Sequence, residues 1–182
     1  MTNFINFITV ARIFLAPIIL IFLIFGDYLV CVLLFFLAGL TDYFDGYLAR
    51  KYNAESQLGE ILDPIADKIL IVFILIGLSV DLDSFLIAFL GSCIIAREIG
   101  VSALRDYSSR NNKSHKTKVT YLAKIKTSVQ LFSIGLYLFA LAFSFNLLII
   151  ISDIFLIIAT LITLYTGYEY TLNVFEKWIL LL

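Results

Sequence analysis

The sequence predicts an all-α membrane protein with six transmembrane helices in one domain, residues 1–182. Hydrophobic residues make up 62% of the chain, whereas soluble domains contain about 45–50%. The mean hydropathy is +1.01. A spanning helix needs about 20 apolar residues. Six apolar runs approach this length: Phe7–Phe25, Tyr28–Thr41, Ile65–Val80, Phe85–Leu104, Lys124–Phe143 and Leu147–Thr166.

Asn6, directly before the first run, and Thr9 and Arg12 within it lie at every third position, so these polar residues share one helix face. This stretch can lie along the membrane interface. Alternatively, Arg12 faces protein or substrate, because an unpaired charge in hydrocarbon is costly. Both interpretations stay open. No small-residue cleavage site follows the run, so no cleavable signal peptide is expected.

The second and third runs are short for a membrane span. They reach full length if their helices continue through residues 42–50 and 59–64, beyond the hydrocarbon. Pro64 can kink the second of these extensions, which membrane helices tolerate. The extensions carry acidic residues, which are therefore expected at the membrane–water boundary.

These acidic residues form two closely spaced pairs. Asp42 and Asp45 are three residues apart, and Asp63 and Asp67 are four apart, so each pair shares one helix face. If the two faces turn together, four carboxylates meet in one pocket, where they must protonate, pair or bind cations. Carboxylate oxygens suit Mg²⁺, Mn²⁺ or Ca²⁺. Two such ions about 4 Å apart can clamp both oxygens of a displacement at phosphorus.

Residues beside the acids favour a phosphate ligand. Gly46 and Gly59 have no side chain, so a substrate can approach the backbone closely there. Arg50 lies two turns after Asp42 on the same face and can pair with a phosphate.

The complete pattern, D-x2-D-G-x2-A-R-x8-G-x3-D-x3-D, resembles the signature of the CDP-alcohol phosphatidyltransferases. It is filled by Asp42, Asp45, Gly46, Ala49, Arg50, Gly59, Asp63 and Asp67. The resemblance implies that family's fold, a homodimer, and two Mg²⁺ or Mn²⁺ ions held by the four aspartates. It also implies that Asp67 is the catalytic base. The CDP-lipid is expected on Asp42, Gly46, Ala49, Arg50, Ser56 and Gly59.

Basic residues are distributed unevenly between the joints. The joints Gly26–Asp27, Asp81–Ser84 and Ser144–Asn146 contain no Lys or Arg. Most basic residues lie in the other joints and near the termini: Arg12, Arg50, Lys51, Arg105, Arg110, Lys113, Lys116, Lys118, Lys124, Lys126 and Lys177. The positive-inside rule then places both termini and the acidic motif on the cytoplasmic side of the inner (cytoplasmic) membrane.

A basic cluster follows the fourth run. Arg97 and Glu98 lie deep in apolar sequence, where they can simply satisfy each other as an ion pair. Arg105 lies two turns after Arg97, and Lys124 and Lys126 open the next run. These four cations are predicted to bind the phosphate of an anionic acceptor. Residues 167–182 are expected to extend the last helix or to lie along the interface.

Three further stretches resemble the phosphatidylglycerophosphate synthases, a bacterial branch of this family: Asn6–Pro17, AREIGVSALRDY and YLAKIKTSVQ. This resemblance implies transfer of a phosphatidyl group from CDP-diacylglycerol to glycerol 3-phosphate, giving phosphatidylglycerophosphate and CMP. Direct transfer without a covalent enzyme intermediate is predicted.

Other functions stay open. The same chemistry can use inositol phosphate, serine or phosphatidylglycerol as acceptor. A cation- or proton-coupled transporter is a distant alternative. Such proteins place acids near the membrane midplane, whereas the acids of this chain are expected at one edge of the membrane. A scaffold protein leaves the carboxylate spacing unexplained. No nucleic-acid partner is expected. Cys31, Cys93 and His115 show no metal-ligand spacing.

Overall fold

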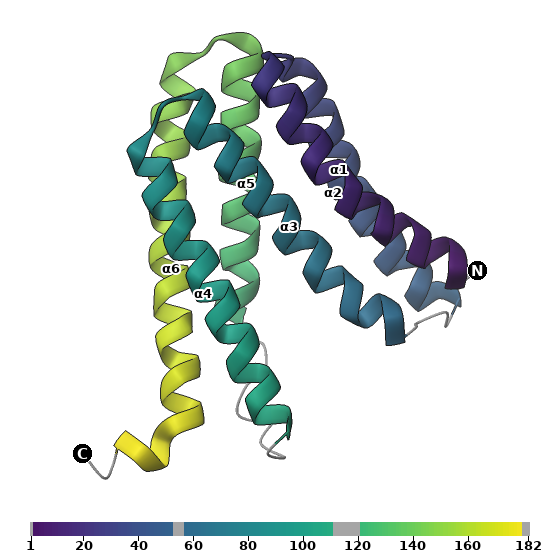
Figure 1. Cartoon of the computed structure of the whole chain (residues 1–182), viewed down its shortest axis with the longest axis vertical. Helices are drawn as coiled ribbons and strands as arrows, with labels where there is room; N and C mark the ends of the chain where they lie inside the picture. Colours follow the sequence, from purple (N-terminus) through teal and green to yellow (C-terminus); the bar gives the residue numbers. More distant parts are fainter. Residues whose placement is uncertain (1, 53–56, 111–120, 180–182) are drawn as a thin grey trace.

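The computed structural model describes residues 2–52, 57–110 and 121–179, and within these ranges the regular structure is entirely helical. Six helices follow one another along the chain (Figure 1): α1 (Thr2–Phe25), α2 (Tyr28–Tyr52), α3 (Gln57–Asp81), α4 (Phe85–Arg110), α5 (Tyr121–Phe143) and α6 (Asn146–Ile179). The predicted fold class, with one helix for each apolar run, is confirmed.

Five of the six helices are long and apolar enough to cross a membrane, judged by length and composition: α1, α2, α4, α5 and α6. The remaining helix, α3, has an apolar second half, but Asp63, Asp67 and Lys68 lie in its first half. This composition agrees with the expectation that its first turns extend beyond the hydrocarbon.

Three tight turns of one type join α1 to α2, α3 to α4, and α5 to α6. The turn residues Gly26, Asp83 and Ser144 have positive φ angles of 78°, 44° and 57°. At the first turn, the Asp27 N–H donates to the Phe22 carbonyl over 3.0 Å, and the Gly26 N–H donates to the Leu23 carbonyl. This is a Schellman motif, and the other two turns repeat its pattern. All three turns lie at the upper end of Figure 1, opposite the chain termini.

Helix α1 packs against both α2 and α3, whereas α2 and α3 do not pack directly on each other in the described part of the chain. Helix α3 also contacts α4 and α5, and α6 packs against α4 and α5. The α1–α3 contact is close, because a Cβ atom at Gly77 would lie 2.8 Å from the Leu20 and Leu23 side-chain ends. Helix α2 packs against α5 as well, so α2 and α3 together connect α1 to the rest of the bundle (Figure 1).

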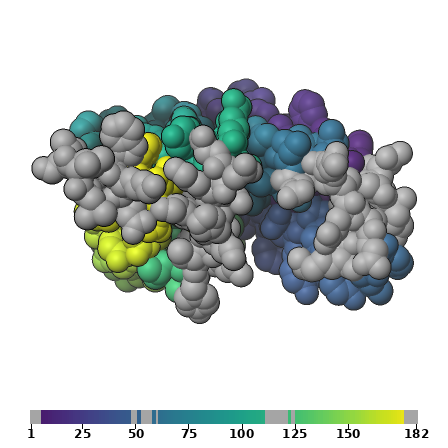
Figure 2. Space-filling view, turned by 90° about the horizontal axis from the view of Figure 1, so that it is seen from below, coloured from purple at the N-terminus to yellow at the C-terminus, as the bar shows by residue number. Residues whose placement is uncertain are grey.

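The end of the molecule that carries the termini also carries the predicted site residues. Figure 2 shows this end, with the first helices (purple and blue) and the last helices (green and yellow) on opposite sides. Helix α6 continues past residue 167 to Ile179 and changes direction at Phe175, whose φ and ψ are −102° and 15°. The predicted extension of the last helix is therefore present, with a bend.

Candidate active site

Two acidic helix faces meet a polar face of α1. Asp42 and Asp45 lie on the second half of α2, and Asp63 and Asp67 lie on the first half of α3. The acids were expected to meet directly between these two helices. Instead, α1 packs against both helices and supplies the groups that join the carboxylates.

The guanidinium of Arg12 on α1 contacts three of the four carboxylates. Its Nη1 donates to Asp42 Oδ1 over 2.5 Å and to Asp67 Oδ1 over 3.0 Å, while Nη2 donates to Asp45 Oδ2. The Arg12 and Asp45 side chains are 1% and 3% exposed, whereas Asp42 and Asp67 are 50% and 45% exposed. The cluster is therefore closed on the Asp45 side and open to solvent at Asp42 and Asp67.

Thr9 completes the cluster one turn before Arg12. Its buried hydroxyl donates to Asp63 Oδ1 over 3.0 Å and lies 3.4 Å from Asp45 Oδ2. Together, Thr9 and Arg12 contact all four aspartates. Of the two predicted interpretations of the α1 polar face, the structure supports the one in which Arg12 faces protein, because its partners are protein carboxylates.

The cluster has a large excess of negative charge. Four carboxylates surround one guanidinium, which leaves a formal charge of −3. The described residues include no group of three acidic, His or Cys side chains already arranged to hold an ion, as expected when the carboxylates spread around a guanidinium. The half-exposed side chains of Asp42 and Asp67 carry carboxylate oxygens, which are hard donors of the kind that divalent cations prefer. Asp42 and Asp67 are therefore candidate ligands for a divalent cation, and the metal site stays a prediction.

Two of the expected CDP-lipid residues, Gly46 and Gly59, lie on the same two helix faces as the aspartates. Gly46 is one turn after Asp42 on α2 and is half-buried, and Gly59 is one turn before Asp63 on α3 and is buried. The side chains of Ala49 and Arg50, and all of Ser56, lie outside the described residues.

A pocket of about 460 Å³ opens beside the cluster, between α3, α4 and α5. One part of its wall is apolar, formed by residues such as Ile71, Val72 and Ile94. The charged part of its wall consists of Asp67, Lys68, Arg97, Glu98, Arg105 and Lys126. Asp67 therefore belongs to both the carboxylate cluster and the pocket.

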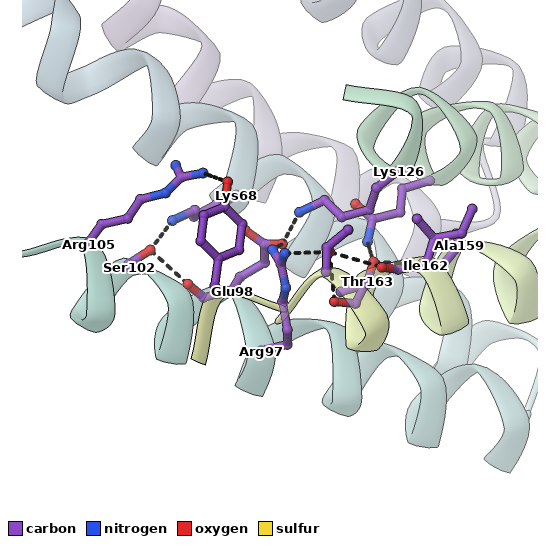
Figure 3. A network of polar contacts seen from close by, with 12 residues as sticks. Lys68, Arg97, Glu98, Ser102, Arg105, Lys126, Ala159, Ile162 and Thr163 are labelled. Carbon is purple, nitrogen blue, oxygen red and sulfur yellow. Dashed lines mark hydrogen bonds and ion pairs between the residues drawn. The ribbon is translucent and has the colours of Figure 1, made fainter. Parts of the chain in front are cut away.

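Apart from Asp67, which bonds to Arg12, the charged residues of the pocket wall lie in one network of polar contacts (Figure 3). Glu98 accepts hydrogen bonds from Arg97 Nη1 over 2.8 Å and from Lys126 Nζ. Lys68 Nζ donates to the hydroxyl of Ser102, one turn after Glu98. Four cations and two carboxylates line the pocket, so its formal charge is +2.

Side chains of helix α6 contact the two arginines of the pocket. Arg97 Nη2 donates to Thr166 Oγ1 over 2.6 Å, and Arg105 Nη2 donates to the Tyr170 hydroxyl over 3.0 Å. The guanidinium carbons of Arg97 and Arg105 lie 5.9 Å and 5.1 Å from the centre of the Tyr170 ring. The contacts from α6 to both arginines are thus made by neutral side chains, while Arg97 also pairs with Glu98 on its own helix.

The structure brings together most of the cations predicted for the acceptor. Arg97, Arg105 and Lys126 line one pocket, while the Lys124 side chain lies outside the described residues. The predicted alternative for Arg97 and Glu98, an ion pair, is also present, and Lys126 joins it.

Sequence reasoning missed four residues of this network: Lys68, Ser102, Thr166 and Tyr170. Lys68 directly follows Asp67, and its charge within a predicted span was an available signal. Thr166 and Tyr170 gave a weaker signal, because they are two polar residues one turn apart in an apolar helix.

The chain is similar to known proteins over most of its length. The family model described as CDP-alcohol phosphatidyltransferase matches residues 2–171, which include every residue of the cluster and of the pocket.

Individual relatives match along nearly their whole length. A protein of Rickettsia typhi is 38% identical over 178 residues, covering 93% of this chain and 96% of the relative. A Rickettsia bellii protein is 40% identical over 172 residues, covering 92% and 93%. A Haemophilus influenzae protein is 34% identical over 171 residues, covering 90% and 89%. All three are named CDP-diacylglycerol–glycerol-3-phosphate 3-phosphatidyltransferase. The chain is therefore a membrane protein that belongs to the CDP-alcohol phosphatidyltransferase family.

Proposed function

We propose that this chain transfers the phosphatidyl group of CDP-diacylglycerol to glycerol 3-phosphate, giving phosphatidylglycerophosphate and CMP. The observation that carries the proposal is the pocket in which Asp67 lies beside a cationic cluster. The names of the relatives, which match over most of the chain, support the same reaction.

The charge of the pocket favours a phosphorylated acceptor. Its formal charge of +2 complements a phosphate monoester, which carries close to two negative charges at pH 7. Arg97 and Arg105 present planar guanidinium groups that can hydrogen-bond two phosphate oxygens at once. Serine and phosphatidylglycerol lack such a monoester and would use this cluster less well.

Asp67 is suited to activate the acceptor. Its side chain lines the pocket and is 45% exposed, so a hydroxyl group of a bound acceptor can reach it. In the proposed reaction, Asp67 takes the proton from the primary hydroxyl of glycerol 3-phosphate. The resulting alkoxide forms a bond to the lipid-linked phosphorus, the bond from that phosphorus to the CMP oxygen breaks, and CMP leaves. The proton then passes from Asp67 to solvent.

Metal ions belong to the same proposal. Asp42, Asp45, Asp63 and Asp67 would hold two Mg²⁺ or Mn²⁺ ions, which would neutralise charge on the diphosphate and on the leaving oxygen. Support comes from the cluster's formal charge of −3, Arg12 included, and from the half-exposed side chains of Asp42 and Asp67. The CDP-lipid is proposed to lie along the same helix faces, against Gly46, Ala49, Arg50, Ser56 and Gly59.

An acceptor screen tests the function. The purified protein in detergent receives labelled CDP-diacylglycerol, Mg²⁺ and one acceptor at a time: glycerol 3-phosphate, inositol phosphate, serine or phosphatidylglycerol. We expect CMP release and a phosphatidylglycerophosphate product with glycerol 3-phosphate alone. Faster turnover of another acceptor would replace the proposed substrate, and no CMP release with any of them would refute the enzyme.

Orientation and assembly complete the proposal. We propose that the protein lies in the inner (cytoplasmic) membrane with both termini and the site in the cytoplasm, and acts as a homodimer. The three turns without Lys or Arg support this orientation. A Ser144→Cys variant should react with a membrane-impermeant thiol reagent applied from the outer side of that membrane. The mass of the detergent-solubilised protein tests the dimer.

A further inference from the structure

Three residues within about one turn of α6 contact the arginines of the pocket, and we name them the α6 clamp: Thr166, Gly167 and Tyr170. Thr166 and Tyr170 accept hydrogen bonds from Arg97 and Arg105, as described above. Both clamp side chains are buried. The two arginines lie two turns apart on α4, so one turn of α6 fixes both.

Gly167 allows the close approach of α6 to Arg97. A Cβ atom at this position would lie 2.9 Å from Arg97 Cγ and 3.2 Å from Arg97 Nε. The stem of Arg97 therefore lies directly across the Gly167 backbone. Any larger residue must displace the arginine side chain, because it cannot occupy the same space.

Hydrogen bonds within α6 orient the hydroxyl of Thr166 so that it accepts from Arg97. It donates backward to the carbonyl oxygens of its own helix, at 2.9 Å from Ile162 and 3.0 Å from Thr163. Its oxygen lone pairs then face the guanidinium of Arg97. This arrangement defines where Arg97 Nη2 must lie.

The clamp holds the arginines without neutralising them. Thr166 and Tyr170 carry no charge, and the described residues give Arg105 no carboxylate partner. A carboxylate at either position would cancel positive charge that a phosphate needs. A hydroxyl and an aromatic ring orient a guanidinium and leave its charge available.

We propose that the α6 clamp is a positioning element for the acceptor: it fixes the orientation of Arg97 and Arg105 and thereby determines how tightly the phosphate monoester binds. The inference rests on the proposed function, in which these arginines bind that phosphate. Thr166, Gly167 and Tyr170 do not touch the reacting atoms, so their effect is expected on acceptor binding alone.

Two substitutions test the clamp with matched controls. Gly167→Ala inserts a methyl group against Arg97, whereas Gly100→Ala on α4 meets no atom within 4 Å. Tyr170→Phe removes only the hydroxyl that Arg105 bonds, whereas Tyr168→Phe removes an exposed hydroxyl two residues away on α6. Each variant is assayed in detergent for CMP release at varied glycerol 3-phosphate and at varied CDP-diacylglycerol.

We expect both clamp variants to raise the KM for glycerol 3-phosphate roughly ten-fold, the effect of losing a hydrogen bond to a charged group. The inhibition constant of inorganic phosphate should rise in parallel. The kcat and the KM for CDP-diacylglycerol should stay near their original values, and both controls should behave as the parent protein. A merely structural role would lower kcat or the amount of folded enzyme without this separation.

Arg97→Gln and Arg105→Gln distinguish failure of the clamp from failure of the proposed phosphate site. If these variants leave the KM for glycerol 3-phosphate unchanged, the pocket does not bind the acceptor phosphate and that part of the proposed function fails. If they raise this KM while both clamp variants leave it unchanged, only the clamp is refuted. Should Gly167→Ala fail to fold, Tyr170→Phe, which keeps the ring, decides the question.

Discussion

Arg12 on the first helix donates a hydrogen bond of 3.0 Å to Asp67, the proposed catalytic base on the third helix. The same Nη1 atom lies 2.5 Å from Asp42 on the second helix. One buried cation of α1 therefore lies at the centre of the acidic cluster. The proposed metal ions would add further positive charge to the same carboxylates.

The first prediction concerns this buried cation. Arg12→Gln should destabilise the protein by about 3–5 kcal/mol, because it leaves the buried Asp45 carboxylate without its ion-pair partner. Thermal unfolding in detergent without divalent ions measures the change. Mg²⁺ should restore part of the lost stability, since an ion bound by the folded cluster replaces the missing positive charge.

Arg110→Gln is the matched control for Arg12. Arg110 pairs with Asp106 over 2.9 Å on the surface of α4, with both side chains more than half exposed. Such a pair contributes only about 0.5 kcal/mol. Equal loss of stability in the two variants, or no response of Arg12→Gln to Mg²⁺, would contradict the role given to Arg12.

The second prediction concerns proton transfer. Asp67→Asn keeps the size of the side chain and an oxygen that can accept from Arg12, but it cannot take the acceptor proton. We expect kcat to fall by about 10²–10⁴-fold, the usual contribution of a general base. CMP release measures the loss. Asp27→Asn, in the turn between α1 and α2, serves as control, and near-normal turnover by Asp67→Asn would remove Asp67 as the base.

The third prediction concerns metal ions. A chelator should stop CMP release, and added Mg²⁺ or Mn²⁺ should restore it. Binding can also be detected without activity, because an ion that binds only the folded state raises the unfolding temperature in a concentration-dependent way. At 100 times the dissociation constant the stabilisation is about 2.7 kcal/mol. Asp63→Asn should weaken this response, whereas Asp106→Asn on the surface of α4 should not. Full activity in the presence of chelator would argue against the metal site.

The fourth prediction concerns the cation contributed by α5. Lys126→Met retains the apolar stem but removes the charge that pairs with Glu98. The pocket then loses one positive charge, so the KM for glycerol 3-phosphate should rise roughly ten-fold, as for the loss of a charged hydrogen bond. Rates of CMP release at varied glycerol 3-phosphate concentration measure this KM. Arg110→Gln is the control for removal of a distant cation. An unchanged KM would place Lys126 outside the binding site.

The helices and the acidic motif could be predicted because their signals are local in the sequence. Apolar runs of helix length define α1 to α6, and the spacing of Asp42, Asp45, Asp63 and Asp67 follows the helical repeat. The position of α1 between α2 and α3 could not be predicted in this way. Only the tertiary packing brings Arg12 to carboxylates 30 and 55 residues further along the chain.

The α6 contribution was hidden for the same reason. Arg97 and Thr166 are 69 residues apart, and Arg105 and Tyr170 are 65 apart, so no periodicity within one helix relates them. In the sequence, Gly167 is one small residue in an apolar helix. Its role becomes visible only when the Arg97 stem is seen against its backbone.

The three Schellman turns have a consequence for biogenesis. Each turn closes a helical hairpin after only a few residues, and the turns contain acids such as Asp27 and Asp83 but no cation. Acidic residues influence translocation far less than basic ones. In the proposed orientation, the nascent chain would enter the bilayer as three successive hairpins, each with a short tip that carries no Lys or Arg, while the basic segments would remain on the cytoplasmic side.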